Sequence, residues 1–132
     1  MSLPKSCASL MTKATQALAS ARVLLDLGDW DGACNRAYYA MFDAAQAALL
    51  GAGVPAPDAL GKTHRGLINT FSAYLVKDGP VSKELGRQLK RAEEVRLVAD
   101  YNGESVLQAD AAELVNQAEL FVQAMQAFFF KD

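Results

Sequence analysis

The chain has 132 residues, of which 52% are hydrophobic and 21% are charged, and its formal net charge at neutral pH is −2. This length fits a single domain spanning residues 1–132 with a substantial core, and the composition excludes a disordered chain. The net charge argues against a generally basic nucleic-acid-binding protein, although it allows a local basic patch. Alanine is abundant and β-branched residues are sparse, which predicts an all-α protein.

Five stretches have the apolar periodicity of helices. In chain order they span residues 5–27, 30–51, 58–77, 82–101 and 107–130. Asp29, Asp58 and Ser82 are expected to cap the second, third and fourth helices, because short polar side chains accept hydrogen bonds from the first free N–H groups. Since short connections make neighbouring long helices antiparallel, we expect an up-down bundle of four to five helices.

Glycine and proline mark the connections between these helices. Gly28 is expected to end the first helix, and residues 51–57, with two prolines and two glycines, are expected to form a loop. The turn Asp78-Gly79-Pro80 follows the third helix, and Asn102-Gly103 follows the fourth.

The cysteines and the N-terminus bear on the cellular setting. Cys7 and Cys34 form no C-x-x-C motif, and Cys34 is expected to be an ordinary buried thiol. This pattern predicts a reducing, cytoplasmic setting. Residues 1–9 lack the apolar core of a signal peptide, and no apolar stretch reaches membrane-spanning length, so we expect no membrane partner.

The second predicted helix has two different faces. The apolar face comprises Trp30, Cys34, Ala37, Tyr38, Met41, Ala45, Ala48 and Leu49, with Phe42 at its rim. The opposite side comprises Asn35, Arg36, Tyr39, Asp43 and Gln46. This side is either a solvated face with one exposed tyrosine or a polar contact surface, since tyrosine and arginine are favoured at interfaces.

Two ionisable residues stand on faces that are expected to be buried. His64, the only histidine, lies within the stripe of the third helix, which includes Phe71 and Tyr74. Arg96 lies between Leu85 and Leu89 near the centre of the stripe of the fourth helix. A neutral, hydrogen-bonded histidine is the simpler reading of His64, and catalysis is the other. Because a buried guanidinium must be paired, Arg96 is either a structural ion pair or part of a site, with Asp100 one turn later as its partner.

A connected polar network is the economical way to bury these groups, with Asp100 and the tyrosines at positions 38, 74 and 101 as available partners. The other cations of the fourth helix form either a solvated face or a surface for phosphates or an acidic partner. They are Lys83, Arg87, Lys90 and Arg91.

Several chemistries are excluded by what the sequence lacks. One histidine cannot supply the paired Glu-x-x-His motifs of a di-iron bundle, and the ligands of a structural zinc site are missing. No glycine-rich phosphate loop is present. We therefore expect neither a metal nor another cofactor.

Four segments, taken in order, resemble the small stand-alone branch of the HEPN domains. Residues 35–42 are similar to its R-x-Y-Y-A-x-F signature, residues 62–68 to its K-x-H-x-G segment, residues 96–101 to its R-x-x-A-D-Y segment, and residues 118–122 to its usual ending. The resemblance implies a helical bundle that usually dimerises. It also implies either a minimal nucleotidyltransferase partner in a toxin–antitoxin-type module or metal-independent RNase activity.

The family's RNase motif, R-x(4–6)-H, is incomplete here. Counted from Arg96, the positions for the histidine hold Tyr101, Asn102 and Gly103. Without a histidine the usual general acid/base is missing, and a carboxylate paired with Arg96 should stay ionised and be a poor proton donor. The sequence therefore favours a protein that is not an enzyme.

Three functional readings follow. The favoured one is a homodimeric binding or regulatory module that recognises RNA, a nucleotide or a nucleotidyltransferase partner through Arg96 and Asp100. In this reading Tyr101, His64 and Tyr38 surround the pair, and Arg36 and Tyr39 are further candidate ligand-binding residues. The second is a weak RNase that uses Arg96 with Tyr101 or His64. The third is a purely structural Arg96–Asp100 pair, whose loss in Arg96→Ala should destabilise the fold by several kcal/mol.

Overall fold

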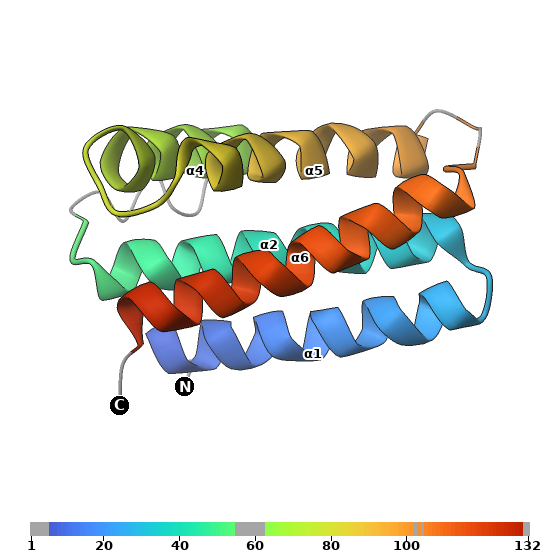
Figure 1. Cartoon of the computed structure of the whole chain (residues 1–132), viewed down its shortest axis with the longest axis horizontal. Helices are drawn as coiled ribbons and strands as arrows, with labels where there is room; N and C mark the ends of the chain where they lie inside the picture. Colours follow the sequence, from blue (N-terminus) through green and yellow to red (C-terminus); the bar gives the residue numbers. More distant parts are fainter. Residues whose placement is uncertain (1–5, 55–62, 102, 104, 131–132) are drawn as a thin grey trace.

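The computed structural model describes residues 6–54, 63–101, 103 and 105–130, and this part of the chain is all-helical. Its elements are α1 (Cys7–Asp26), α2 (Trp30–Gly51), α4 (His64–Phe71), the π-helix η1 (Ser72–Lys77), α5 (Lys83–Tyr101) and α6 (Gln108–Phe129). The four long helices run alternately up and down along the long axis of the molecule (Figure 1). The predicted all-α up-down bundle is confirmed.

Local capping sets several of these boundaries. The Asp29 side chain accepts a hydrogen bond from the Gly32 N–H at 2.9 Å, and the Ser82 hydroxyl accepts one from the Leu85 N–H at 3.2 Å. Both predicted caps are confirmed. Gly28 has a φ of 85° after the end of α1, a conformation that glycine adopts without steric strain.

The third predicted helix ends at Lys77 as expected, but its start and the conformation of its last turns differ from the prediction. Asp58, its expected cap, lies outside the described residues. In the described part Thr63 is the N-cap, and its hydroxyl accepts the Gly66 N–H at 2.8 Å. Beyond Phe71 the chain continues as a π-helix, in which each turn holds more residues than an α-helical turn.

The wider turn explains why Tyr74 does not join the core. Leu75 remains on the face of Phe71 and is 3% exposed, whereas Tyr74 rotates away and is 49% exposed. The expectation that Tyr74 shares the apolar stripe, and is available to a buried network, is wrong because it assumed α-helical spacing through this segment.

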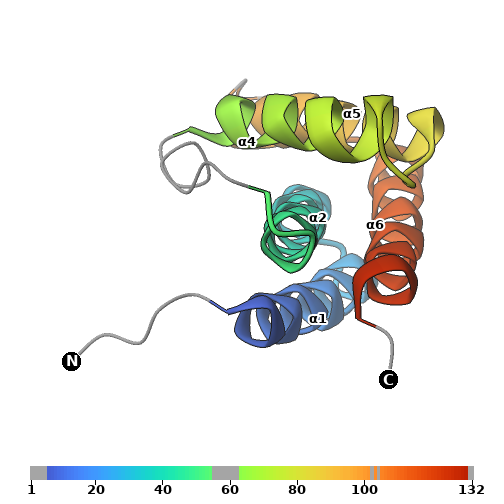
Figure 2. The same cartoon turned by 90° about the vertical axis from the view of Figure 1, so that its left-hand side faces the viewer.

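α2 is the central helix of the bundle. Figure 2 shows it end-on, with α1 below, α6 to one side, and α4 and α5 forming a layer above it. α4 is seen nearly side-on in that view, so it crosses α2 rather than running along it. Because neighbours surround α2, Gln46, which was expected on its polar side, is only 3% exposed.

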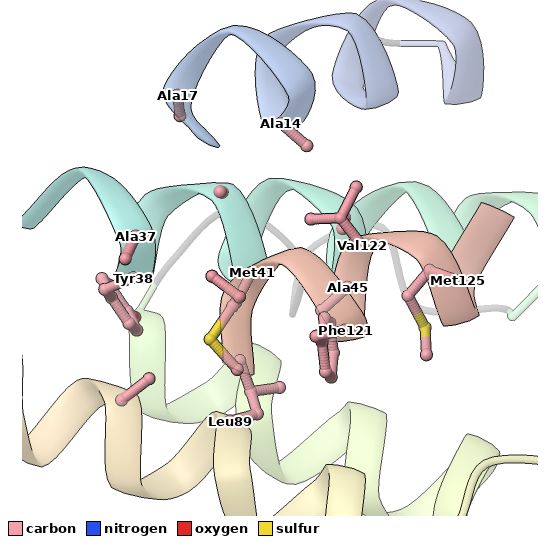
Figure 3. Packing of buried hydrophobic residues seen from close by; sticks show 14 of the residues in the cluster. Ala14, Ala17, Ala37, Tyr38, Met41, Ala45, Leu89, Phe121, Val122 and Met125 are labelled. Atoms are coloured by element: carbon pink, nitrogen blue, oxygen red, sulfur yellow. The ribbon is translucent and has the colours of Figure 1, made fainter. Parts of the chain in front are cut away.

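The core between these helices combines small residues with a few large ones. Fully buried alanines of α1 and α2 allow the two helices to pack closely, and the sulfur-containing and aromatic side chains of α2 and α6 fill the space toward α5 (Figure 3). Cys34 is fully buried, and burial, followed by the nearby Asp31, raises its thiol pKa to about 12. The expectation of an ordinary buried thiol is confirmed.

Candidate functional site

Arg96 lies on the buried face of α5, as the sequence predicts. Its side chain is 10% exposed. Within the described part of the chain its Nε atom is buried and has no hydrogen-bond partner. A buried donor without an acceptor is unfavourable, so Arg96 is held in the structure with its hydrogen-bonding capacity incompletely used.

The predicted Arg96–Asp100 pair is present, but it is long. The Arg96 Nη1 and Asp100 Oδ2 atoms are 3.5 Å apart, at the outer limit of a hydrogen bond. Asp100 also accepts hydrogen bonds from the Asn35 Nδ2 of α2, at 3.2 and 3.4 Å. The carboxylate is therefore shared between two helices and compensates the arginine only in part.

His64 lies beside Arg96, which the favoured functional reading assumed although the spacing of residues along the chain does not predict it. Its Nδ1 is 2.8 Å from the Tyr38 hydroxyl and 3.4 Å from the Arg96 Nη2. A guanidinium is always a donor, so this nitrogen faces Arg96 with its lone pair, and the ring is assigned as neutral with its proton on Nε2. Burial, and then the positive charge of Arg96, lower the pKa of His64.

Aromatic rings surround this contact. Phe42 stacks on His64 with ring centroids 4.4 Å apart, and Tyr38 points from α2 toward the α4–α5 layer (Figure 3). The Arg96 guanidinium lies 5.0 Å from the centroid of Tyr38 and 5.9 Å from that of Tyr39, distances typical of cation–π interactions. Burial, and then the charge of Glu93, raise the pKa of the Tyr38 hydroxyl, which keeps it protonated.

We call Tyr38, Tyr39, His64, Arg96 and Asp100 the Arg96 centre. These residues come from α2, α4 and α5. The predicted polar network is confirmed for Tyr38, His64, Arg96 and Asp100, and Tyr39 joins it through ring contacts that were not predicted. Tyr101 is 74% exposed and makes no hydrogen bond or ring contact with the centre in the described part of the chain. Arg36 lies at the edge, where its guanidinium is 5.0 Å from the Tyr39 centroid.

Glu93 and Asn35 were missing from the predicted site. Glu93 is 8% exposed, lies one turn before Arg96, and forms an ion pair with the exposed Arg65 at 3.8 Å. The buried stripe of α5 thus runs through Leu89, Glu93 and Arg96 and is rotated from the expected one. The spacing of Glu93, Arg96 and Asp100 was the available signal, because residues three and four apart share a helix face.

The centre combines a cation, a neutral imidazole and a protonated phenol under partial burial. These groups suit an anion such as phosphate, and the imidazole can also exchange a proton near neutral pH. Among the described residues, no three His, Cys, Asp or Glu side chains are grouped so that they could hold a metal ion. No described helix is long and apolar enough to cross a membrane.

The lowered pKa of His64 predicts a pH-dependent stability. The folded state binds a proton at His64 more weakly than the unfolded state does. The stability that neutral His64 contributes is therefore fully present above its ordinary pKa of 6.5 and is lost as the pH falls below that value. We expect the urea midpoint to fall between about pH 7 and about pH 5.5, and the fall to be smaller in His64→Gln. An equal fall of the urea midpoint in wild type and in His64→Gln would show that other groups cause the pH dependence.

Comparison with known proteins identifies the family. The HEPN domain model matches residues 8–128. The chain is 37% identical to a UPF0332 protein of Gloeobacter violaceus over 90% of this chain and 92% of that protein. It is 30% identical to a Methanocaldococcus jannaschii protein named "Putative toxin MJ0605", over 89% of this chain and 84% of that protein. A second protein of that organism, named "Putative toxin MJ0142", is 26% identical over 90% of this chain and 78% of its own length. The chain therefore belongs to the HEPN domain family, as its four sequence segments indicated.

Proposed function

We propose that this chain is the HEPN component of a toxin–antitoxin-type module and that its Arg96 centre binds a phosphate of RNA or of a nucleotide. The observation that carries the proposal is the buried Arg96. Among the residues that the structure describes, its Nε has no hydrogen-bond partner and its carboxylate partner is 3.5 Å away. An arginine that served only to hold the fold would be expected to have its donors filled. The names of the two Methanocaldococcus relatives support the toxin-type assignment.

The charges around the centre support an anionic ligand. Three cations and two carboxylates lie in or next to the centre. The cations are Arg96, Arg36 and the exposed Arg65, and the carboxylates are those of Asp100 and Glu93. A guanidinium offers planar, paired donors to phosphate, and the assigned Nε2–H of His64 is a further donor. The resemblance also implies a homodimer with a minimal nucleotidyltransferase partner, and we include both in the proposal.

Binding of a fluorescent single-stranded RNA, followed by anisotropy at low and at high salt, tests this function. We expect Arg96→Gln to weaken binding by more than about tenfold, because a charged hydrogen bond to phosphate is lost. Arg87→Gln is the matched control, since Arg87 is exposed on the same helix and pairs with Glu84. Equal binding by Arg96→Gln and wild type, both folded, would overturn the proposal.

The position of His64 favours a second candidate, a metal-independent RNase. His64 lies 3.4 Å from Arg96, although it comes from a different helix than the usual histidine of the family motif. Because its pKa is lowered, it is neutral at pH 7 and is able to act as a general base. Cleavage of structured RNA in EDTA, reduced about 10²-fold or more by His64→Gln, would establish this activity. Cleavage that His64→Gln leaves unchanged would exclude it.

A further inference from the structure

A second arginine, Arg36, is fixed next to the Arg96 centre. Its Nε and Nη2 atoms both donate to the Asn35 Oδ1, at 3.1 and 2.9 Å, and its guanidinium lies 5.0 Å from the Tyr39 centroid. Among the described residues no carboxylate lies within ion-pair distance of Arg36. The half-buried guanidinium is thus held in one orientation, and the described part of the chain supplies it with no counter-charge.

The same groups join Arg36 to Arg96. Tyr39 lies within cation–π distance of both guanidiniums, at 5.0 Å for Arg36 and 5.9 Å for Arg96. Asn35 accepts from Arg36 through Oδ1 and donates to Asp100 through Nδ2, and Asp100 contacts Arg96. This assignment of the amide is self-consistent, because a guanidinium only donates and a carboxylate only accepts.

The position of Arg36 relative to Arg96 is therefore set by the Tyr39 ring and the Asn35 amide. In the described part of the chain, Arg36 uses Nε and Nη2 for its hydrogen bonds and leaves Nη1 open. Ordering a long side chain is entropically unfavourable, and a pre-oriented fork loses less entropy when it binds phosphate. The open Nη1 of Arg36 and the guanidinium of Arg96 thus lie on either side of the shared Tyr39 contact, where each can meet a phosphate of the same strand.

We infer that Arg36 binds a second phosphate, next to the one bound at Arg96, and that the ligand is single-stranded RNA rather than a mononucleotide. This inference rests on the proposed function and specifies its ligand. A nucleoside monophosphate such as AMP reaches Arg96 only, whereas a single strand of RNA reaches both arginines. Tyr39 and Asn35 are positioning residues, because they act through Arg36.

The experiment compares AMP with a short single-stranded oligoribonucleotide on wild type, Arg36→Gln, Arg96→Gln and Arg87→Gln. We expect Arg36→Gln to weaken oligonucleotide binding about tenfold and AMP binding by less than about twofold, because AMP loses only the nearby charge and no direct contact. The slope of log affinity against log salt for the oligonucleotide should fall by about 0.7, the value for one phosphate contact on a single strand. Arg96→Gln should weaken both ligands, and Arg87→Gln neither.

The outcomes separate this inference from the proposed function. If wild type binds AMP and RNA, but Arg36→Gln matches wild type on both, the second phosphate site is wrong and the Arg96 site stands. If Arg36→Gln loses both ligands equally, Arg36 only supports the Arg96 centre, and the inference is also overturned. If wild type binds neither ligand, the proposed function fails and this inference fails with it. Circular dichroism and melting temperature check that Arg36→Gln is folded.

Discussion

Arg96→Met is expected to be at least as stable as the wild-type protein, and Arg96→Ala is expected to lose about 2–4 kcal/mol of unfolding free energy. Alanine leaves a cavity among Tyr38, Tyr39 and His64, where the guanidinium and its stem now lie. Methionine fills that space without burying a charge. Arginine, methionine and alanine are all good helix formers. Helix propensity therefore changes the stability difference between Arg96→Met and Arg96→Ala by only a fraction of a kcal/mol.

The reason lies in how poorly the charge is compensated. The Nε of Arg96 has no partner among the described residues, and its carboxylate is 3.5 Å away and shared with Asn35. Replacing a buried ion-pair group with an apolar one of similar volume is often neutral or stabilising, whereas truncation is not. Asp100 keeps its Asn35 hydrogen bonds in either variant and remains 25% exposed, so it is not stranded.

Urea denaturation of both variants, with Arg87→Met as the exposed control, decides between a site and a structural pair. Arg87→Met should stay within about 0.5 kcal/mol of wild type. If Arg96→Met loses as much stability as Arg96→Ala, the guanidinium contacts hold the fold together, and the purely structural reading is correct. A stable Arg96→Met that no longer binds RNA shows instead that the charge is kept for the ligand.

Most of the fold could be predicted from local sequence. The bounds of α2 match the prediction at both ends, because Asp29 caps it and a glycine-rich segment follows it. The segment after Phe71 could not be predicted, since an α-helical period was assumed where the backbone adopts π-helical turns. One extra residue per turn is enough to move Tyr74 from the core to the surface.

The candidate site was predictable only in part. Arg96 and Asp100 are one turn apart on one helix, so their pairing follows from local spacing. The contact of His64 with Arg96 joins residues 32 positions apart, and it depends on how α4 crosses α2. The apolar periodicity of α4 and that of α5 do not predict how α4 crosses α2. Glu93 was not among the predicted site residues, because the buried face of α5 is rotated from the expected apolar stripe.

Phe121→Ala is expected to destabilise the protein by about 3–5 kcal/mol, the usual loss for truncating a fully buried phenylalanine. Phe121 of α6 is fully buried, and its ring centroid is 5.7 Å from that of Phe71, at the end of α4. Urea denaturation measures the loss. Leu120→Ala is the matched control, because the neighbouring Leu120 is 59% exposed and its truncation should have little effect.

The Phe71–Phe121 pair links α6 to the helix that begins at His64. A double-mutant cycle with Phe71→Ala should therefore show a coupling of about 1 kcal/mol, as aromatic pairs do beyond their buried area. If the pair also holds α4 in place, backbone amides of α4 should exchange faster in Phe121→Ala than in Leu120→Ala, and RNA binding should weaken through His64. If exchange becomes faster only in α6, then α4 is held by α2 and α5 alone. The geometry of the Arg96 centre then does not depend on this aromatic pair.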